Sequence, residues 1–174
     1  MKKALVLVDF QNDFIDGALG TKEAVSIVPK VMEKIRMFDG KILATRDTHE
    51  ENYLETQEGR KLPVKHCIRN TKGWQINGEI QSLLSETPVD KETFGSRELP
   101  EILKKYDEKE KIESITLVGL CTDICVISNA MVLKAYFPEV PIIVDASCCA
   151  GVTPQSHKQT LEAMKVCQIE VVEE

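Results

Sequence analysis

Short apolar runs alternate with amphipathic stretches along most of this chain. The runs are rich in β-branched residues and lie at 4–9, 41–47, 87–92, 114–119, 141–147 and 169–173. Because few polar residues interrupt them, they are typical of parallel strands that are covered on both faces. The amphipathic stretches between them lie at 24–38, 75–85, 98–110, 122–137 and 154–167.

This alternation of strands and helices predicts an α/β fold. We expect a single domain over residues 1–174, with a doubly wound, six-stranded, mostly parallel sheet flanked by helices. Two of the expected helices open with start signals, Thr122-Asp123 and Thr153-Pro154.

The stretch 48–73 shows neither the apolar pattern of a strand nor that of a helix. It contains two of the three histidines, His49 and His66. A structureless segment longer than about 15 residues in a compact domain is usually functional or disordered. We therefore expect this loop to carry function.

Polar and thiol side chains follow several of the predicted strands. Ligands of open α/β sheets bind beyond the carboxyl ends of the strands. This rule selects Asp9, Asp47, His49, Lys91, residues 119–125, Asp145 and the pair Cys148-Cys149. We expect these strand ends to converge on one crevice.

Composition narrows the class of partner. The chain has 174 residues, 43% of them hydrophobic and 29% charged, and a net charge of −6. An acidic chain of this kind gives no reason to expect nucleic acid or a membrane surface as a partner. No apolar segment approaches the roughly 20 residues of a membrane span, so we expect a cytoplasmic protein. Its six cysteines should then stay reduced, and they form no CxxC…CxxC metal motif.

Cys125 stands near the start of the helix expected at 122–137. If Thr122 is the N-cap, the thiol lies in the first turn, where unpaired N–H groups and the helix dipole lower the pKa of a cysteine. Position alone favours a nucleophile and a plain buried residue about equally. The same ambiguity applies to Cys121.

A thiol nucleophile needs a base. His157 is expected deep in the last helix, away from the strand ends, so we favour Asp9, whose pKa could be raised by apolar neighbours. Lys91 between Asp9 and Cys125 would hold a thiolate and place the carboxylate. Alone, Asp9 could be a turn residue and Lys91 a solvated surface residue.

Asp47 and His49 stand two residues apart at a strand end, so their side chains should share a face. His66 could complete a mixed oxygen and nitrogen site from the loop, with Glu58 as a fourth ligand and Glu55 behind it. Two histidines and a carboxylate suit one divalent ion, Zn²⁺, Fe²⁺ or Mn²⁺. The spacing alone is common by chance.

Six motifs occur in an order that resembles the isochorismatase-like cysteine hydrolases, and among them most closely the nicotinamidases and pyrazinamidases. They are "LVLVDFQNDF" (5–14), "TRDTH" (45–49), "PVKHCIRNTKG" (63–73), "DKETFGS" (90–96), "VGLCTDICVISNA" (118–130) and "DASCCAG" (145–151), and together they span nearly the whole chain.

The resemblance implies a catalytic triad of Asp9, Lys91 and Cys125. It also implies a cis peptide before Cys121, so that the N–H groups of Cys121 and Cys125 form an oxyanion hole, with Phe14 and Leu120 contacting the substrate. The family's divalent metal maps onto Asp47, His49 and His66, and the glutamate that some members add maps onto Glu58. A metal-dependent hydrolysis of nicotinamide to nicotinate and ammonia, through a thioester, follows from this resemblance.

One position departs from the family's pattern. Nicotinamidases usually have an aromatic residue three positions before the second metal histidine, as one wall of the pyridine pocket, and here that position is Pro63. Trp74 could replace it only if the loop folds back. Two other functions therefore stay open: hydrolysis of another small amide or carbamoyl compound, and a non-catalytic or redox module that uses Cys121 and Cys125. A homo-oligomer is also possible.

Overall fold

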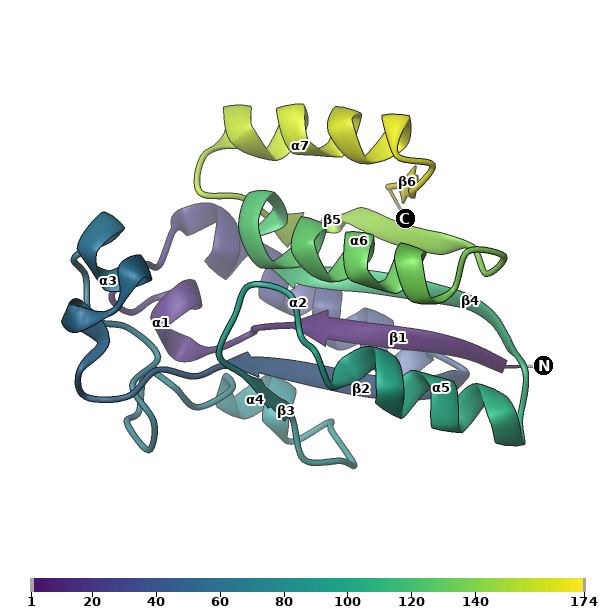
Figure 1. The fold of residues 1–174 in the computed structure, drawn as a ribbon, viewed down its shortest axis with the longest axis horizontal. Coiled ribbons are helices and arrows are strands. Elements are labelled where there is room, and N and C mark those ends of the chain that lie inside the picture. Colours follow the sequence, from purple (N-terminus) through teal and green to yellow (C-terminus); the bar gives the residue numbers. More distant parts are fainter. Residues whose placement is uncertain (1, 174) are drawn as a thin grey trace.

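The computed structural model describes residues 2–173, and a six-stranded sheet forms its centre (Figure 1). The strands are β1 (Lys2–Val8), β2 (Gly40–Asp47), β3 (Val89–Lys91), β4 (Ile112–Leu120), β5 (Ile142–Ala150) and β6 (Glu170–Val172). Their order is β3-β2-β1-β4-β5-β6, and every neighbouring pair is parallel. The doubly wound α/β sheet expected from the sequence is confirmed.

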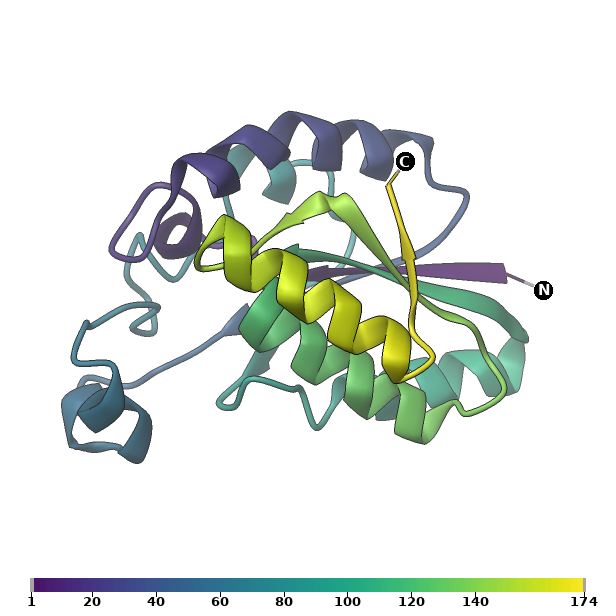
Figure 2. The same cartoon turned by 90° about the horizontal axis from the view of Figure 1, so that it is seen from above.

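Helices cover both faces of this sheet. Figure 2 shows α2 (Lys22–Met37) and the short α4 (Gly78–Gln81) on one face. On the other face lie α5 (Leu99–Lys109), α6 (Ile127–Tyr136) and α7 (Pro154–Val166). Among the described residues, no helix has the length and apolar character that crossing a membrane requires.

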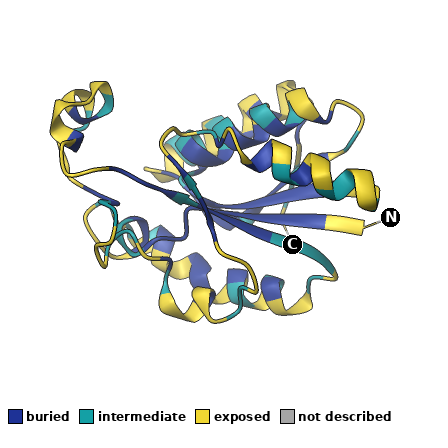
Figure 3. Ribbon diagram, turned by 60° about the horizontal axis from the view of Figure 1, so that its bottom comes forward, coloured by how far each residue is buried: buried dark blue, intermediate teal, exposed yellow. Residues whose placement is uncertain are grey.

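The central strand β1 explains why the apolar runs are almost continuous. Ala4, Val6 and Val8 enter the core cluster on one face, whereas Leu5 and Leu7 enter the cluster on the other. Successive side chains of a strand point to opposite faces, so a strand that is covered twice needs apolar residues at every position. Figure 3 shows these strands as the buried centre of the molecule.

Most of the expected helices form, with two differences among them. The helix expected at 75–85 is only α4, which begins after its N-cap Asn77 and ends at Gln81. The helix expected at 122–137 is divided into a π-helical turn, η2 (Thr122–Val126), and α6. The last helix starts as predicted, with Thr153 and Ser156 forming a capping box.

The stretch 48–73 is not a structureless loop, contrary to our expectation. It contains the 3₁₀ turn η1 (Tyr53–Glu55) and the helix α3 (Gln57–Lys61), and a further short helix, α1 (Asn12–Ile15), follows β1. Helices of three to five residues are too short to show a period in the sequence. In Figure 1, α1 and α3 lie at the end of the sheet toward which the strands point.

Candidate functional site

Asp9, Lys91 and Cys125 meet at the carboxyl end of the sheet, and all three are buried. Asp9 directly follows β1 and has a φ of 51°, a left-handed conformation that a non-glycine residue rarely adopts. Lys91 is the last residue of β3, and its Nζ lies 2.7 Å from Asp9 Oδ2 and 3.4 Å from Cys125 Sγ. The cation therefore stands between the carboxylate and the thiol.

Other side chains hold Asp9 and Lys91 in place. Thr45 Oγ1 donates a hydrogen bond of 2.6 Å to Asp9 Oδ1, and Lys91 Nζ also lies 3.1 Å from Asp47 Oδ1. Burial opposes the charged form of Lys91, but the anionic neighbours, first Asp9, outweigh it and raise the Lys91 pKa well above its usual value. The lysine therefore remains a cation within the protein.

The pKa of Cys125 shifts in the opposite direction from the one that the helix start led us to expect. Burial, and then the nearby Asp9, raise the pKa of Cys125 well above its usual value, and the opposing effect of Lys91 is smaller. Burial also raises the pKa of Asp9, against the lowering effect of Lys91. A carboxylate with a raised pKa beside a neutral thiol has the chemistry of a general base.

The turn that carries Cys125 begins one residue earlier than the sequence indicated. Cys121, not Thr122, is the N-cap, and Cys125 is the fourth residue of the π-helical turn. Such turns are rare and frequently lie at functional sites. The Leu120–Cys121 peptide bond is cis, which is the geometry that the family resemblance implies.

The Thr122 side chain contacts the last helix, α7, and does not cap the turn η2. Its Oγ1 lies 2.8 Å from His157 Nδ1, and the neighbouring Asp123 accepts a hydrogen bond of 3.0 Å from Val152 N. The expectation that His157 lies far from the strand ends was wrong, because α7 begins at Pro154 and packs its first turn against η2. The spacing within the sequence gave no sign of this contact.

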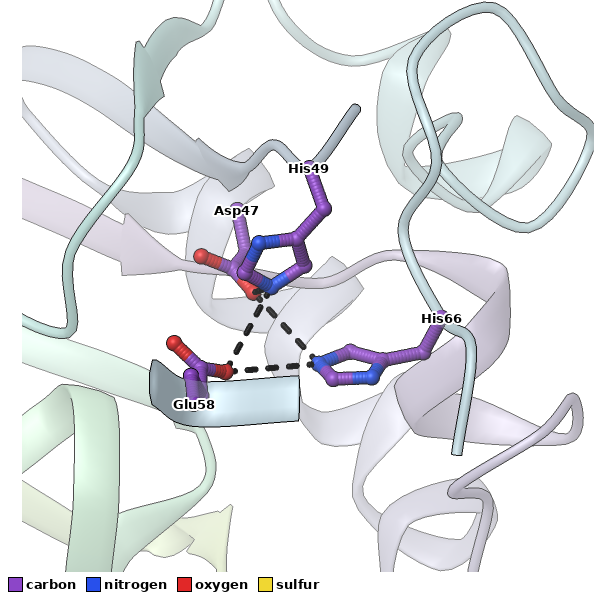
Figure 4. A group of neighbouring side chains, drawn as sticks. All are labelled: Asp47, His49, Glu58 and His66. Carbon is purple, nitrogen blue, oxygen red and sulfur yellow. Dashed lines mark ion pairs between the residues drawn. The ribbon is translucent and has the colours of Figure 1, made fainter. Parts of the chain in front are cut away.

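A second cluster contains Asp47, His49, Glu58 and His66, each of which offers one ligand atom within 4.8 Å of the others (Figure 4). Asp47 ends β2 and His49 follows it, whereas Glu58 lies in α3 and His66 lies beyond that helix. His49 Nε2 lies 2.9 Å from Asp47 Oδ2 and 3.5 Å from Glu58 Oε1. The four ligands named from the sequence are thus brought together, and Glu55 is exposed.

The orientation of His66 fits a bound cation. Its Nδ1 lies 2.8 Å from the carbonyl oxygen of Val64, so Nδ1 carries the proton and donates. This leaves Nε2 facing Asp47 Oδ2 at 3.7 Å and Glu58 Oε1 at 3.9 Å. A cation between these three atoms could bind all of them, and a neighbouring carbonyl commonly orients a metal-binding histidine in this way.

Aromatic side chains surround the histidines. Phe14 lies 5.5 Å from the His66 ring, between centroids. Tyr53 is fully buried, and its ring centroid lies 4.6 Å from that of His49 and 5.0 Å from that of His66. Sequence reasoning missed Tyr53; the only signal was a single aromatic residue between two histidines.

Trp74, the possible replacement for the aromatic wall at Pro63, is already in contact with other side chains. The Trp74 ring is covered by the Arg46 guanidinium at 3.5 Å, and its Nε1 donates to Thr48 Oγ1 at 2.8 Å. Pro63 itself is exposed. Leu120 is buried in the same core cluster as Phe14, and contact of either residue with a substrate stays a prediction.

Gln11 is a further residue that the sequence analysis missed. Its side chain makes a pair of hydrogen bonds, each 2.7 Å long, with the backbone carbonyl and N–H of Asp47. A third bond of 2.8 Å joins it to the carbonyl of Trp74. Gln11 therefore fixes the backbone of a candidate metal ligand from the segment that follows β1.

Comparison with known proteins gives consistent matches over the full length. The Isochorismatase domain family matches residues 3–173. A nicotinamidase from Schizosaccharomyces pombe is 25% identical over 98% of this chain and 93% of its own.

Two solved structures are similar in fold and sequence. A pyrazinamidase of Pyrococcus horikoshii in complex with zinc has a TM-score of 0.82 and 29% identity, and the match covers 100% of both chains. An N-carbamoylsarcosine amidase from Thermoplasma acidophilum has a TM-score of 0.76 and 27% identity, over 99% of this chain and 96% of its own.

Proposed function

The chain belongs to the isochorismatase domain family and is an amide hydrolase, and from this premise we propose that it hydrolyses nicotinamide to nicotinate and ammonia with Asp9, Lys91 and Cys125. The observation that carries the proposal is the position of Lys91, whose Nζ lies within 3.4 Å of both Asp9 Oδ2 and Cys125 Sγ. The adjacent cluster of two histidines and two carboxylates supports the choice of a metal-dependent member.

In the proposed reaction, Asp9 takes the thiol proton as Cys125 Sγ attacks the amide carbonyl carbon. The backbone N–H groups of Cys121 and Cys125 donate to the oxyanion of the tetrahedral intermediate. When the C–N bond breaks, Asp9 returns the proton to the departing amine, which leaves as ammonia. Water then hydrolyses the thioester, with Asp9 again as the base, and this releases the carboxylic acid and restores the thiol.

Lys91 has two tasks in this scheme. As a cation it stabilises the negative charge that passes between Asp9 and Cys125, and through its contact with Asp47 it joins the triad to the metal cluster. Because burial raises the pKa of Cys125, the attack needs a base such as Asp9 to take the thiol proton.

Asp47, His49, Glu58 and His66 would hold one divalent ion, Zn²⁺, Fe²⁺ or Mn²⁺, since imidazole and carboxylate ligands suit these metals. A metal bound there would act as a Lewis acid toward a pyridine nitrogen or a water molecule. The zinc in the similar Pyrococcus horikoshii structure supports this assignment. His66 Nδ1, which donates to Val64 O, would keep Nε2 directed at the ion.

Hydrolysis of an aliphatic amide or a carbamoyl compound is the second candidate. It is favoured by exposed Pro63, which leaves the usual second aromatic wall of a pyridine pocket without a counterpart at that position. The likeness to an N-carbamoylsarcosine amidase supports it as well. The redox alternative has less support, because burial raises the pKa of both Cys121 and Cys125, and disulfide exchange needs a thiolate.

The test is an ammonia-release assay on metal-loaded protein with nicotinamide, pyrazinamide and carbamoyl amides. We expect nicotinamide to be hydrolysed, with binding weaker by a factor of about 5 to 10 than in a pocket with two aromatic walls, since the missing wall costs about 1 kcal/mol. If a carbamoyl or aliphatic amide is hydrolysed while millimolar nicotinamide is not, the second candidate replaces the first.

Within residues 2–173 all six cysteines are free, and a nucleophilic thiol functions only when it is reduced. A reducing compartment such as the cytoplasm is therefore part of the proposal.

A further inference from the structure

Asn129 is a buried polar residue that the proposed reaction does not use. It lies in α6, is 1% exposed, and makes three hydrogen bonds. Its Nδ2 donates to Cys125 O at 2.8 Å and to Phe94 O at 3.1 Å, and its Oδ1 accepts from Ser96 N at 2.9 Å. All the partners are backbone groups, so Asn129 fixes the course of the chain.

The partners of Asn129 come from two segments that are distant in the sequence. Cys125 belongs to η2, whereas Phe94 and Ser96 belong to the loop that connects β3 to α5. That loop begins directly after Lys91, the last residue of β3. Asn129 therefore joins the segment that follows the lysine to the turn that carries the thiol.

The loop has few other anchors. β3 is an edge strand of three residues, paired only with β2. At the far end of the loop, Ser96 Oγ accepts from Leu99 N at 3.1 Å, which ties it to the start of α5. Between these points the backbone of Gly95 lies against α6, since a Cβ there would be 3.3 Å from Ser128 O and 3.2 Å from Val132 Cγ2. The loop thus rests on α6 and is held there through Asn129.

We infer that Asn129 is a positioning residue, which sets Lys91 and Cys125 relative to each other by tying the loop after β3 to the nucleophile's turn. The inference rests on the proposed function, because it assumes that Cys125 attacks the substrate with Lys91 beside it. Asn129 forms no hydrogen bond to Phe14 or to the metal cluster, which Lys91 meets only through Asp47, so loss of this tie should slow the chemical step more than it weakens substrate binding.

Asn129→Ser removes the two hydrogen bonds to the loop and can keep the hydrogen bond to the carbonyl of Cys125. Ser128, one residue earlier, donates from Oγ to the carbonyl of Ile124 at 2.6 Å, and a hydroxyl in the next position can donate to Cys125 O in the same manner. It is too short to reach Phe94 or Ser96. Ser128→Ala is the matched control, because it removes a hydrogen bond from the same helix without touching the loop.

We expect Asn129→Ser to lower kcat for ammonia release on the order of 10- to 100-fold, as small misplacements of reacting groups do, with KM changed less than about 2-fold. Ser128→Ala should leave both within about 2-fold of wild type. Thermal unfolding shows whether each variant is folded at the assay temperature. If Asn129→Ser is not, the rates of all variants are compared at a lower temperature at which it is folded, and the same loss of kcat is expected there.

A second measurement does not need the physiological substrate. Cys125 attacks p-nitrophenyl acetate, the acetyl group moves to sulfur, the thiol proton passes to Asp9, and p-nitrophenolate leaves in a burst. The part of the burst that Cys125→Ala removes belongs to Cys125. We expect Asn129→Ser to slow this part by the same factor as kcat.

The outcomes are distinct. A wild-type burst rate and kcat in Asn129→Ser, or a change confined to KM, would overturn the positioning role. If wild type shows the burst but releases no ammonia from nicotinamide, the proposed function fails, while the burst rates still decide the role of Asn129. Absence of any Cys125-dependent burst in wild type overturns both.

Discussion

At the scale of single residues, the candidate site depends on charges that are placed out of water. Asp9 and Lys91 are both buried, and their ion pair is 2.7 Å long. Breaking a buried pair by removing one partner leaves an uncompensated charge, which is strongly destabilising. Cys125 differs, because burial raises its pKa and so favours the neutral thiol, whose replacement leaves no charge behind.

Cys125→Ala should therefore abolish turnover and leave the fold intact. Alanine is tolerated in a helical turn, and the cost of the lost sulfur is limited to packing. Ammonia release and circular dichroism of the purified variant measure the two effects. Cys148→Ala is the control, since Cys148 is a buried cysteine on β5 that contacts neither Asp9 nor Lys91 in the hydrogen bonds described. Activity near wild type in Cys125→Ala would rule out a covalent mechanism.

The pH profile should depend on Asp9. This carboxyl can accept the thiol proton only when ionised, so the rate must fall as pH decreases through its pKa. Burial raises that pKa, which places the acidic limb of kcat/KM above the range of an exposed aspartate.

Thr45→Val tests this assignment. The Thr45 hydroxyl donates to Asp9 Oδ1 and lowers the Asp9 pKa, so its removal should move the acidic limb to higher pH. Thr116→Val, a buried threonine on β4, is the control and should not move the limb. If the acidic limb is identical in Thr45→Val and wild type, Asp9 is not the base in the rate-limiting proton transfer.

At the scale of elements, the close approach of β1 and β4 brings the thiol's turn to Asp9. Gly119 pairs with Val8 near the ends of these strands and has a φ of 147°. A Cβ on Gly119 would lie 2.2 Å from the carbonyl oxygen of Val8. Only glycine permits this backbone conformation at this distance.

Gly119→Ala should destabilise the protein by about 3 kcal/mol, because strain and the clash add. For a chain of this size that corresponds to a decrease in Tm of roughly 6 to 12 °C in a calorimetric scan. Gly78→Ala is the control, since a Cβ there meets no atom within 4 Å and alanine favours the helix. Equal Tm values for the two variants would contradict the close approach.

At the scale of the whole molecule, the residues of the candidate metal cluster come from both the sheet and the stretch 48–73. Asp47 ends β2, whereas Glu58 and His66 lie within or beyond α3, which Figure 1 shows outside the main body of the fold. An ion held by both parts would link them. Its binding free energy would then add to the free energy of unfolding.

We expect about one divalent ion per chain by elemental analysis, and an increase in Tm of roughly 5 to 10 °C when the free ion is at about 100 times its Kd. His49→Ala and His66→Ala should lose the ion, the gain in Tm and the activity together. Glu55 is an exposed residue of the same stretch, so Glu55→Ala should keep the ion, the gain in Tm and the activity. Full activity of wild type after exhaustive chelation would place this chain among metal-independent amidases.

The sequence by itself determined the order of strands and helices along the chain and most of the candidate site residues. Strands covered on both faces need apolar residues at every position, and strand ends of a parallel sheet meet at one edge, so Asp9, Asp47, Lys91 and Cys125 could be selected before any coordinates were known. These are local or topological rules, and they leave a direct trace in the order of residues.

Only the tertiary structure decided the contacts between segments that no local rule connects. Examples are His157 on Thr122, Tyr53 against the histidines, and Asn129 across the loop after β3. It also decided the direction in which the pKa of Cys125 shifts, since the effect of burial outweighs that of Lys91. Burial and side-chain contacts of this kind depend on how the whole chain packs, and a pattern of residue types along the sequence does not record them.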